Sequence, residues 1–379
     1  MQKARIAIVG GGLSGLYAAF LLQQAGVSDF VLFEARETLG GRILSSPAVF
    51  AAEPSTLDTV KAHDRVDLGP TWFWPDMQPQ LDRVIRDFGI ATFAQHETGD
   101  MLVERAYNQA AVRTRGYVNS PTSMRLAGGM AALTDALASR LDARSVTTGE
   151  AVRDLQRTQS GIEVHSVNAA GHARTTLAEH VFLALPPRLI EASLRFEPAL
   201  PAGPAQSWRD TPTWMAPHAK YIAVYETPFW REQGLSGEAR SMSGPLGEIH
   251  DASMEGGHAA LFGFFGIPGS VRSTVKDLDL RAHCRAQLVR LFGQAAATPV
   301  NEFIKDWSRD PYTATGDDLS GSSQHLSGAA ASGPLGAWSG GLTGIASEWS
   351  AHFPGYVAGA IDAAQRGVKA FMSSATASS

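Results

Sequence analysis

Apolar and polar residues alternate in blocks that predict a strand–helix–strand unit at the start of the chain. Residues 4–10 form an apolar run rich in isoleucine and valine, which is typical of a strand buried in a parallel sheet. Residues 13–26 then place apolar side chains at helical spacing and end at Gly26, a common helix stop. Because residues 29–35 form a second apolar run, the pattern predicts a βαβ unit with a right-handed crossover.

Further along the chain, the same periodicities predict a mixture of helices and strands. Residues 80–90 and 130–143 are amphipathic at helical spacing, whereas residues 161–185 read as a hairpin that leads into a buried strand. Residues 219–226 predict another strand. Residues 314–341 are rich in Gly, Ser and Ala and predict a long loop, and loops of this length are often functional. The fold class expected from this order is α/β.

Composition narrows the class of protein. The 379 residues suffice for two domains, and 44% hydrophobic with 18% charged residues is ordinary for a globular protein. A net charge of −5 argues against a nucleic-acid partner. No window approaches the ~18 apolar residues of a membrane span. Strand-like residues begin at Ile6, so we expect no cleavable leader and a cytoplasmic protein.

The single cysteine, Cys284, excludes an internal disulfide and a multi-cysteine metal site. It lies within residues 281–293, which have the pattern of an amphipathic helix. We therefore expect a buried structural thiol and no metal.

The glycines after the first strand have the spacing of a dinucleotide-binding fingerprint. Gly10 permits a tight turn, Gly12 lets the backbone approach a pyrophosphate, and Gly15 lets the helix pack closely on the strand. The helix that starts at Leu13 and Ser14 offers free N–H groups and a positive dipole to phosphates. The fingerprint predicts a nucleotide cofactor without separating NAD from FAD.

An acidic residue stands where such a cofactor would place a ribose. Glu34 ends the second predicted strand, 19 residues past Gly15, and is positioned to accept hydrogen bonds from an adenosine ribose. A carboxylate at this place disfavours a 2′-phosphate, so NADP is not expected.

A second glycine motif follows directly. The run Glu34-Ala35-Arg36, a short gap and then Gly40-Gly41-Arg42 resembles the second signature of the flavin-containing amine oxidase family. That group includes monoamine, polyamine and L-amino-acid oxidases. The resemblance implies FAD as the cofactor, with the backbone at Gly41 close to it and Arg42 neutralising phosphate charge.

Other segments resemble the family in the family's order. "DLGPTWFWP" at 67–75 implies that the chain passes beside the flavin ring, and "GEAVRDL" at 149–155 implies an adenine contact from the backbone. The positions singled out by these two segments are Gly69, Pro70, Thr71, Trp72 and Val152.

Downstream motifs carry the expected catalytic side chains. Lys220 stands eight residues before Pro228, as the family's lysine stands before Pro-Phe-Trp, which implies that it holds a water against flavin N5. "DWSRDPYTATG" implies that Trp307 and Tyr312 lie near the flavin, with Tyr312 also a substrate candidate.

The last motif resembles the family's closing segment. Glu348 falls on the motif's glutamate, whereas Gly355, Tyr356 and Val357 fall where a helix N-terminus meets the flavin pyrimidine. Such a dipole would stabilise the negative charge of the reduced flavin. Tyr356 would also form an aromatic wall of the substrate site, together with Trp307.

The chain resembles a shortened, bacterial-type member, and it departs from the family's pattern at several places. The family's Gly-Thr-Glu is Ala346-Ser347-Glu348 here, which keeps an oxygen donor and the acid. Gly316 replaces the cysteine that links the flavin in monoamine oxidases, so FAD should be held non-covalently. Asp317 falls where those enzymes have a second tyrosine, and either binds a cationic ammonium or is simply solvated. Residues 96–125 replace a larger helical subdomain, so the substrate site is either open or closed by the second subunit of a homodimer.

The resemblance implies two domains. An FAD-binding Rossmann-like domain would consist of residues 1–75, 127–200 and 312–379, and a smaller α+β substrate domain of residues 76–126 and 201–311.

The implied activity is FAD-dependent oxidation of a primary or secondary amine to an imine. A hydride equivalent would pass to flavin N5, and O2 would reoxidise the flavin to give H2O2. Lys220, Tyr356 and Trp307 are the expected catalytic side chains. Three alternatives stay open: an L-amino-acid oxidase with Arg113 or Arg125 as carboxylate clamp, a carbon–carbon desaturase related to protoporphyrinogen oxidase, and a non-catalytic flavoprotein.

Overall fold

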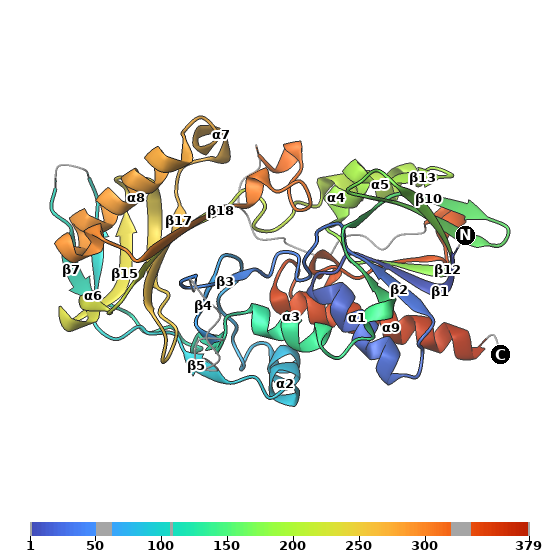
Figure 1. The fold of residues 1–379 in the computed structure, drawn as a ribbon, viewed down its shortest axis with the longest axis horizontal. Helices are drawn as coiled ribbons and strands as arrows, with labels where there is room; N and C mark the ends of the chain where they lie inside the picture. The colour runs from blue at the N-terminus through green and yellow to red at the C-terminus, as the bar shows by residue number, and fades with distance from the viewer. Residues whose placement is uncertain (1, 51–62, 107–108, 320–334, 378–379) are drawn as a thin grey trace. The chain divides into compact units, whose positions relative to one another are not determined.

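The computed structural model describes residues 2–50, 63–106, 109–319 and 335–377 (Figure 1). The chain forms two compact units, each built from segments that are far apart in the sequence. Unit 1 consists of Met1–Arg42, Leu133–Ala216 and Pro311–Ser379, and unit 2 of Ile43–Ala132 and Pro217–Asp310.

Unit 1 is organised around an eight-stranded mixed sheet. Seven strands run in the order β13-β10-β11-β12-β1-β2-β9, and β19 pairs with β12. The central neighbours β12, β1 and β2 are parallel, whereas β10, β11 and β12 form an antiparallel meander. The strands are β1 (Gln2–Val9), β2 (Phe30–Phe33), β9 (Val146–Thr147), β10 (Glu150–Thr158), β11 (Gly161–Asn168), β12 (Ala173–Leu183), β13 (Arg195–Glu197) and β19 (Leu342–Gly344).

The helices of unit 1 pack on this sheet. Helix α1 (Leu13–Gln24) joins β1 to the parallel strand β2 and lies beside α9 (Val357–Ala377), as Figure 1 shows. This arrangement confirms the predicted βαβ unit. Smaller elements complete the unit: α4 (Pro187–Ser193), α5 (Ala202–Asp210), η2 (Ala143–Ser145), η5 (Gly316–Asp318), η6 (Gly336–Trp338) and η7 (Ser347–Trp349). Helix α3 (Ala131–Ala138) crosses the boundary between the units in sequence.

Unit 2 contains a seven-stranded sheet in the order β18-β14-β17-β16-β15-β6-β7. Its neighbouring strands are antiparallel except for β15 and β6, which run parallel. The strands are β6 (Asp100–Glu104), β7 (Val112–Arg115), β14 (Ala219–Tyr225), β15 (Leu235–Ser241), β16 (Leu246–Asp251), β17 (Ala259–Phe265) and β18 (Asn301–Asp306).

Helix α8 (Asp277–Phe292) covers one face of this sheet. It buries Leu280, Cys284 and Leu288 against strand residues such as Tyr221 and Leu261. The buried thiol was expected from the helical pattern, and burial raises the pKa of Cys284 well above its ordinary value. The remaining elements of unit 2 are β3 (Ser45–Pro47), β4 (Arg65–Asp67), β5 (Thr92–Ala94), β8 (Met124–Leu126), α2 (Pro79–Asp87), α6 (Phe229–Glu232), α7 (Gly269–Arg272), η3 (Gln294–Ala297) and η4 (Trp307–Arg309).

The observed unit boundaries differ from the domain boundaries that we expected. Residues 43–75, which we assigned to the FAD-binding domain, group with unit 2, because Val66 and Leu68 share an apolar cluster with Ile222 of β14. Residues 201–216, assigned to the substrate domain, group with unit 1, where Trp208 of α5 joins the core beneath the sheet.

Several predicted elements are confirmed. Strand β14 occupies residues 219–225, and the hairpin β11–β12 turns near residues 169–172. Part of the predicted loop 314–341 lies outside the described residues. None of the helices in the described part of the chain has the length and hydropathy needed to cross a bilayer.

Candidate functional site

The first glycine motif forms a tight turn between β1 and α1. The turn brings the backbone of Gly10 close to the first helical turn, since a Cβ added at Gly15 would lie 2.0 Å from the Gly10 carbonyl oxygen. No side chain larger than hydrogen fits at Gly15 without moving the turn. The sequence prediction that Gly15 allows close helix–strand packing is therefore consistent with this geometry.

The two glycine motifs meet in unit 1. The Gly40 N–H donates to the Gly11 carbonyl oxygen over 2.9 Å, and Gly12 and Gly40 form a parallel bridge. Gly41 has a φ of +60°, and a Cβ there would lie 3.1 Å from the Gly12 Cα. The two glycine motifs, some 30 residues apart in the sequence, thus form one surface on which the glycines expose backbone atoms and no side chains.

The start of α1 has the chemistry of an anion site. In the described chain, no side chain caps its first turn and no acidic residue occupies that turn. The first N–H groups of a helix have no partner within the helix, and they carry the positive end of its dipole. The turn at Gly12, Leu13 and Ser14 therefore suits a phosphate rather than a cation.

Glu34 lies at the end of β2, directly beneath the first motif. Its side chain is buried and accepts hydrogen bonds from the N–H groups of Gly11 and Arg36, both over 2.8 Å. Each carboxylate oxygen retains a second acceptor position. Glu34 is thus fixed in orientation and can still accept hydrogen bonds from ligand hydroxyls. Ala35 follows in the same extended segment.

Tyr312, which we predicted to lie near the flavin and the substrate, packs against Arg36. The Arg36 guanidinium sits over the Tyr312 ring, 5.2 Å from its centroid, and also donates to Thr313 Oγ1 over 3.2 Å. Because Arg36 follows Glu34, Tyr312 belongs to the ribose end of the nucleotide motif. That Tyr312 borders the substrate stays a prediction.

Arg42 forms a bidentate ion pair with Glu348. Nη1 contacts Oε1 at 2.6 Å and Nη2 contacts Oε2 at 3.0 Å, while Nη2 also donates to Ser347 Oγ over 3.2 Å. The Glu348 side chain is fully buried, whereas that of Arg42 is 24% exposed. The charge of Arg42, which we expected to neutralise phosphate, is thus balanced by a carboxylate. The pair fixes the second glycine motif to η7.

The closing motif places Tyr356 beside a residue that sequence reasoning missed. The rings of Trp214 and Tyr356 stack with centroids 6.5 Å apart and an interplanar angle of 26°. Gly355, with a φ of +84°, allows this approach, because a Cβ there would lie 2.7 Å from the Trp214 Cβ. Val357 begins α9 immediately afterwards. Met215, which follows Trp214 in the sequence, has a φ of +68°, an uncommon conformation for a residue other than glycine. No sequence pattern predicts this conformation.

Asp317 and Val152 complete the predicted positions in unit 1. Asp317 is exposed in η5, whereas its neighbour Asp318 is buried and forms an ion pair with Arg188 at 2.6 Å. The exposure of Asp317 therefore favours the solvated alternative over an ammonium site. Val152 is buried in β10 at a bulge, where its pairing with β11 shifts register.

Lys220 is buried in unit 2 beneath the predicted flavin-proximal segment. Its Nζ donates to the carbonyl oxygens of Asp67 and Gly69 over 3.0 and 2.7 Å, and contacts Thr71 Oγ1 at 2.6 Å. Nζ also lies 4.2 Å from the centroid of the Phe262 ring. Burial lowers the pKa of Lys220 to about 7, against the opposing effect of Asp67. The polar contacts of Lys220 hold residues 67–71 in place.

Trp307 also contacts this segment. Its Nε1 donates to the Leu68 carbonyl oxygen over 3.1 Å, and Lys305 Nζ lies 4.3 Å from its ring centroid. Lys220, Trp307 and the segment that contains Gly69, Pro70 and Thr71 therefore form one cluster in unit 2. The glycines, Glu34, Glu348 and Tyr356 form the other cluster, in unit 1.

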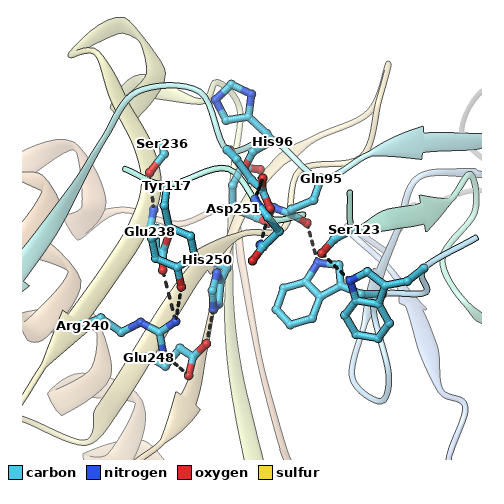
Figure 2. A pocket seen from close by; sticks show the side chains of 14 residues that line it. Gln95, His96, Tyr117, Ser123, Ser236, Glu238, Arg240, Glu248, His250 and Asp251 are labelled. Carbon is cyan, nitrogen blue, oxygen red and sulfur yellow. Dashed lines mark hydrogen bonds and ion pairs between the residues drawn. The ribbon is translucent and has the colours of Figure 1, made fainter. Parts of the chain in front are cut away.

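A cavity of about 180 Å³ opens beside Trp72 within unit 2. Figure 2 shows Glu238, Arg240 and Glu248 on one side of it, and Gln95 and Ser123 on the other. The indole Nε1 of Trp72 donates to Gln95 Oε1 over 2.7 Å. Trp72 contacts His250 of the cavity lining and also Phe262, which lies outside that lining, and its place beside a cofactor stays a prediction. Sequence reasoning missed the cavity because its walls come from many short segments.

Comparison with known proteins identifies the family. A model of "Flavin containing amine oxidoreductase" matches residues 114–370, and one of "NAD(P)-binding Rossmann-like domain" matches residues 8–88. The chain belongs to the flavin-containing amine oxidoreductases. Membership of this family, together with the Rossmann-like match, identifies FAD as the cofactor.

Individual relatives carry amine oxidase names. The chain is 27% identical to a probable flavin-containing monoamine oxidase A of Dictyostelium discoideum, a match that covers 50% of this chain and 40% of the relative. It is 29% identical to a putrescine oxidase of Kocuria rosea, covering 61% of this chain and 50% of the relative. The chain thus spans about half the length of the curated relatives that it matches.

Solved structures share the fold of this amine oxidoreductase. A cyclohexylamine oxidase from Brevibacterium oxydans superposes with a TM-score of 0.78 at 18% identity, covering 98% of this chain and 99% of that one. A putrescine oxidase variant gives a TM-score of 0.77 at 20% identity, with the same coverage. At these identities the likeness establishes the fold.

Proposed function

We propose that this protein is an FAD-dependent amine oxidase that converts a small amine to an imine with O2 as electron acceptor. The observation that carries the proposal is the meeting of the two glycine motifs at Gly12 and Gly40, in a family whose members contain flavin. A backbone surface without side chains, next to an uncapped helix start, suits an extended diphosphate.

The described residues fit the adenosine diphosphate half of FAD. We assign the pyrophosphate to Gly12, Leu13 and Ser14, and the adenosine ribose to Glu34. Val152 would meet the adenine through its backbone. Ala35 and Arg36, with Tyr312 beneath the guanidinium, would border the ribose. Because Gly316 replaces the linking cysteine of monoamine oxidases, FAD would be held non-covalently.

The other predicted positions would contact the flavin half of FAD. We assign the flavin pyrimidine to the start of α9 at Gly355, Tyr356 and Val357, where the helix dipole favours negative charge. The Arg42–Glu348 pair would fix the second glycine motif beneath the cofactor. When bound, FAD accepts a hydride equivalent from the amine α-carbon and returns the two electrons to O2, which leaves as H2O2.

Lys220 would act by holding residues 67–71 in position. Its nitrogen already contacts Asp67, Gly69 and Thr71, so a water-binding role requires one of these contacts to be exchanged. Burial disfavours the charged form of Lys220 and so lowers its pKa. Trp307 would support the same segment through Leu68.

A small amine is the substrate class that we propose. The relatives named for monoamines, putrescine and cyclohexylamine support it. The two arginines that we considered as the carboxylate clamp of an L-amino-acid oxidase are engaged elsewhere: Arg125 donates to the carbonyl oxygens of Ser253 and Ala252, and Arg113 is paired with Asp100. The amine must react in its neutral form, since an ammonium has no lone pair to assist cleavage of the α C–H bond.

Purified holoprotein tests the proposal directly. We would measure O2 consumption and H2O2 release with alkylamines, aromatic amines, diamines and L-amino acids. Oxidation of at least one amine, with H2O2 and aldehyde formed in equal amounts, is expected. A protein that binds FAD and turns over none of them, but oxidises a porphyrinogen or a polyene, would belong to the desaturases instead.

A further inference from the structure

The start of α9, to which we assign the flavin pyrimidine, packs against the side chain of Trp214. The Trp214 and Tyr356 rings stack with centroids 6.5 Å apart and an interplanar angle of 26°. Both residues are half-buried. Stacked aromatic pairs gain stability beyond the area that they bury, so Trp214 restrains the orientation of the Tyr356 ring.

Trp214 also packs directly on the backbone of Gly355. A Cβ added at Gly355 would lie 2.7 Å from the Cβ and 3.1 Å from the Cγ of Trp214. The Gly355 N–H donates to the Ser347 carbonyl oxygen over 3.2 Å, and the Tyr356 carbonyl oxygen accepts from the Ala360 N–H over 3.2 Å, within the first turn of α9. One side chain therefore contacts both of the residues that immediately precede this helix.

Trp214 lies in a tight turn formed by residues 213–216. The Ala216 N–H donates to the Thr213 carbonyl oxygen over 3.1 Å. Met215, the third residue of the turn, has a φ of +68°, a value found at this place in type II turns, where glycine or asparagine is usual. A methionine in this conformation is strained, and such residues persist where the surrounding contacts hold them. The neighbours of this turn therefore determine its conformation.

Two polar contacts anchor the turn within unit 1. The Thr213 N–H donates to Oδ1 of the buried Asp318 over 3.3 Å. The Trp214 carbonyl oxygen accepts from Arg42 Nη1 over 3.4 Å. Because Arg42 also pairs with Glu348, the turn is attached to the second glycine motif through its backbone and to the start of α9 through the Trp214 ring.

We propose that Trp214 is a positioning residue of this flavoenzyme, whose ring and carbonyl oxygen hold the start of α9 and the second glycine motif in the geometry that the flavin requires. The helix dipole acts only within the first turn, so its effect on the negative charge of the reduced flavin depends on where that turn lies. Loss of the Trp214 ring frees Tyr356 and Gly355 and should weaken this stabilisation. An effect on amine turnover rests on the proposed function, whereas an effect on the reduction potential of bound FAD does not.

Reduction potentials test the proposal. The midpoint potential of bound FAD is measured in wild-type holoprotein, Trp214→Ala, Trp214→Phe and the control Phe371→Ala. Phe371 is a half-buried aromatic residue near the other end of α9 and packs on His180 and Phe182, so the control removes an aromatic contact from the same helix. We expect Trp214→Ala to disfavour flavin reduction about tenfold, which makes the potential about 30 mV more negative for two electrons.

The other variants fix the interpretation. Trp214→Phe keeps a ring that can stack, so its potential should lie closer to the wild type than to Trp214→Ala, and Phe371→Ala should match the wild type. Equal potentials in Trp214→Ala and the wild type, an equal shift in Phe371→Ala, or a shift in Trp214→Phe as large as in Trp214→Ala would overturn the role. If melting temperatures show that Trp214→Ala does not fold, Trp214→Leu replaces it with the same expected shift.

Anaerobic stopped-flow kinetics separate this proposal from the proposed function. With an amine that the wild type oxidises, Trp214→Ala should lower the rate constant of flavin reduction at saturating amine about tenfold and leave the Kd for the amine within about threefold. A weaker Kd with an unchanged rate constant would place Trp214 in contact with the amine and overturn the positioning role. If no amine reduces the flavin, the proposed function fails, and the potentials still decide the role of Trp214.

Discussion

Arg42 and Glu348 are 306 residues apart in the sequence and form a two-point ion pair, with the carboxylate fully buried. Arg42 ends the second glycine motif, and Glu348 lies in η7, shortly before α9. The pair therefore connects the N-terminal segment of unit 1, which ends at Arg42, to its C-terminal segment, residues 311–379. A contact of this kind holds the glycine motif in register with the helix start that we assign to the flavin.

Removing the carboxylate should destabilise the protein strongly. Glu348→Ala leaves the largely buried Arg42 guanidinium without its counter-charge, and breaking a buried pair in this way costs about 3 kcal/mol. Urea unfolding measures this loss. In the double variant Arg42→Met/Glu348→Ala no charge is left unpaired, so part of the loss should be recovered. A Glu348→Ala protein within about 0.5 kcal/mol of the wild type, the range of an ordinary surface change, would contradict the role of the pair.

Gly12→Ala should weaken the binding of FAD and leave the fold intact. Gly12 has extended backbone angles that alanine adopts, and its added Cβ would approach no closer than 3.8 Å to described atoms. The fold should tolerate the change, whereas the methyl group would occupy the proposed pyrophosphate surface. We expect the Kd for FAD to rise at least tenfold, about 1.4 kcal/mol, with circular dichroism unchanged.

Gly203→Ala is the matched control, because Gly203 lies in α5 with open space around it. Its affinity for FAD should equal that of the wild type. If Gly12→Ala binds FAD as tightly as Gly203→Ala does, the pyrophosphate assignment fails.

Lys220 should give the unfolding free energy a distinctive pH dependence. Burial lowers its pKa to about 7, whereas a lysine in an unfolded chain titrates near ~10.4. Between these values the unfolded chain binds the proton and the folded protein does not, so the free energy of unfolding rises with pH. Urea unfolding from pH 7 to 9.5 should show a smaller rise for Lys220→Met than for the wild type. The exposed Lys276→Met serves as the control, and parallel curves for all three proteins would contradict a depressed pKa.

Gly355→Ala should impair the site more than the fold. Its Cβ would lie 2.7 Å from that of Trp214, and its φ of +84° disfavours any side chain. The ring of Trp214 must then move away from Tyr356. We expect kcat/KM for amines to fall at least tenfold, while the melting temperature falls by a few degrees. Unchanged kinetics in a folded Gly355→Ala protein would exclude the Trp214–Tyr356 pair from the site.

The local parts of this architecture could be predicted from the sequence. The turn at Gly10–Gly15, the βαβ unit and the buried helix around Cys284 depend on short-range periodicity and on glycine geometry, both of which are readable along the chain. These features agree with the structure because few distant contacts decide them.

The remaining parts depend on contacts between distant segments. The packing of Arg36 over Tyr312 joins residues far apart in the sequence, and the motif around Asp317 does not show that the buried acid is Asp318, one residue further on. Trp214 has no motif that marks it, and its partner Tyr356 lies in another segment of unit 1. The boundary at residue 43 follows the packing of Val66 on Ile222, which no local pattern reveals.

An anaerobic titration of the holoprotein tests the central claim most directly. FAD absorbance is followed while a small primary amine is added without O2, and air is admitted at the end. The account predicts that the amine bleaches the flavin, that one aldehyde forms per flavin, and that O2 restores the oxidised spectrum with one H2O2 released. A protein that binds no flavin, or whose bound flavin stays oxidised with every amine tested, would contradict it.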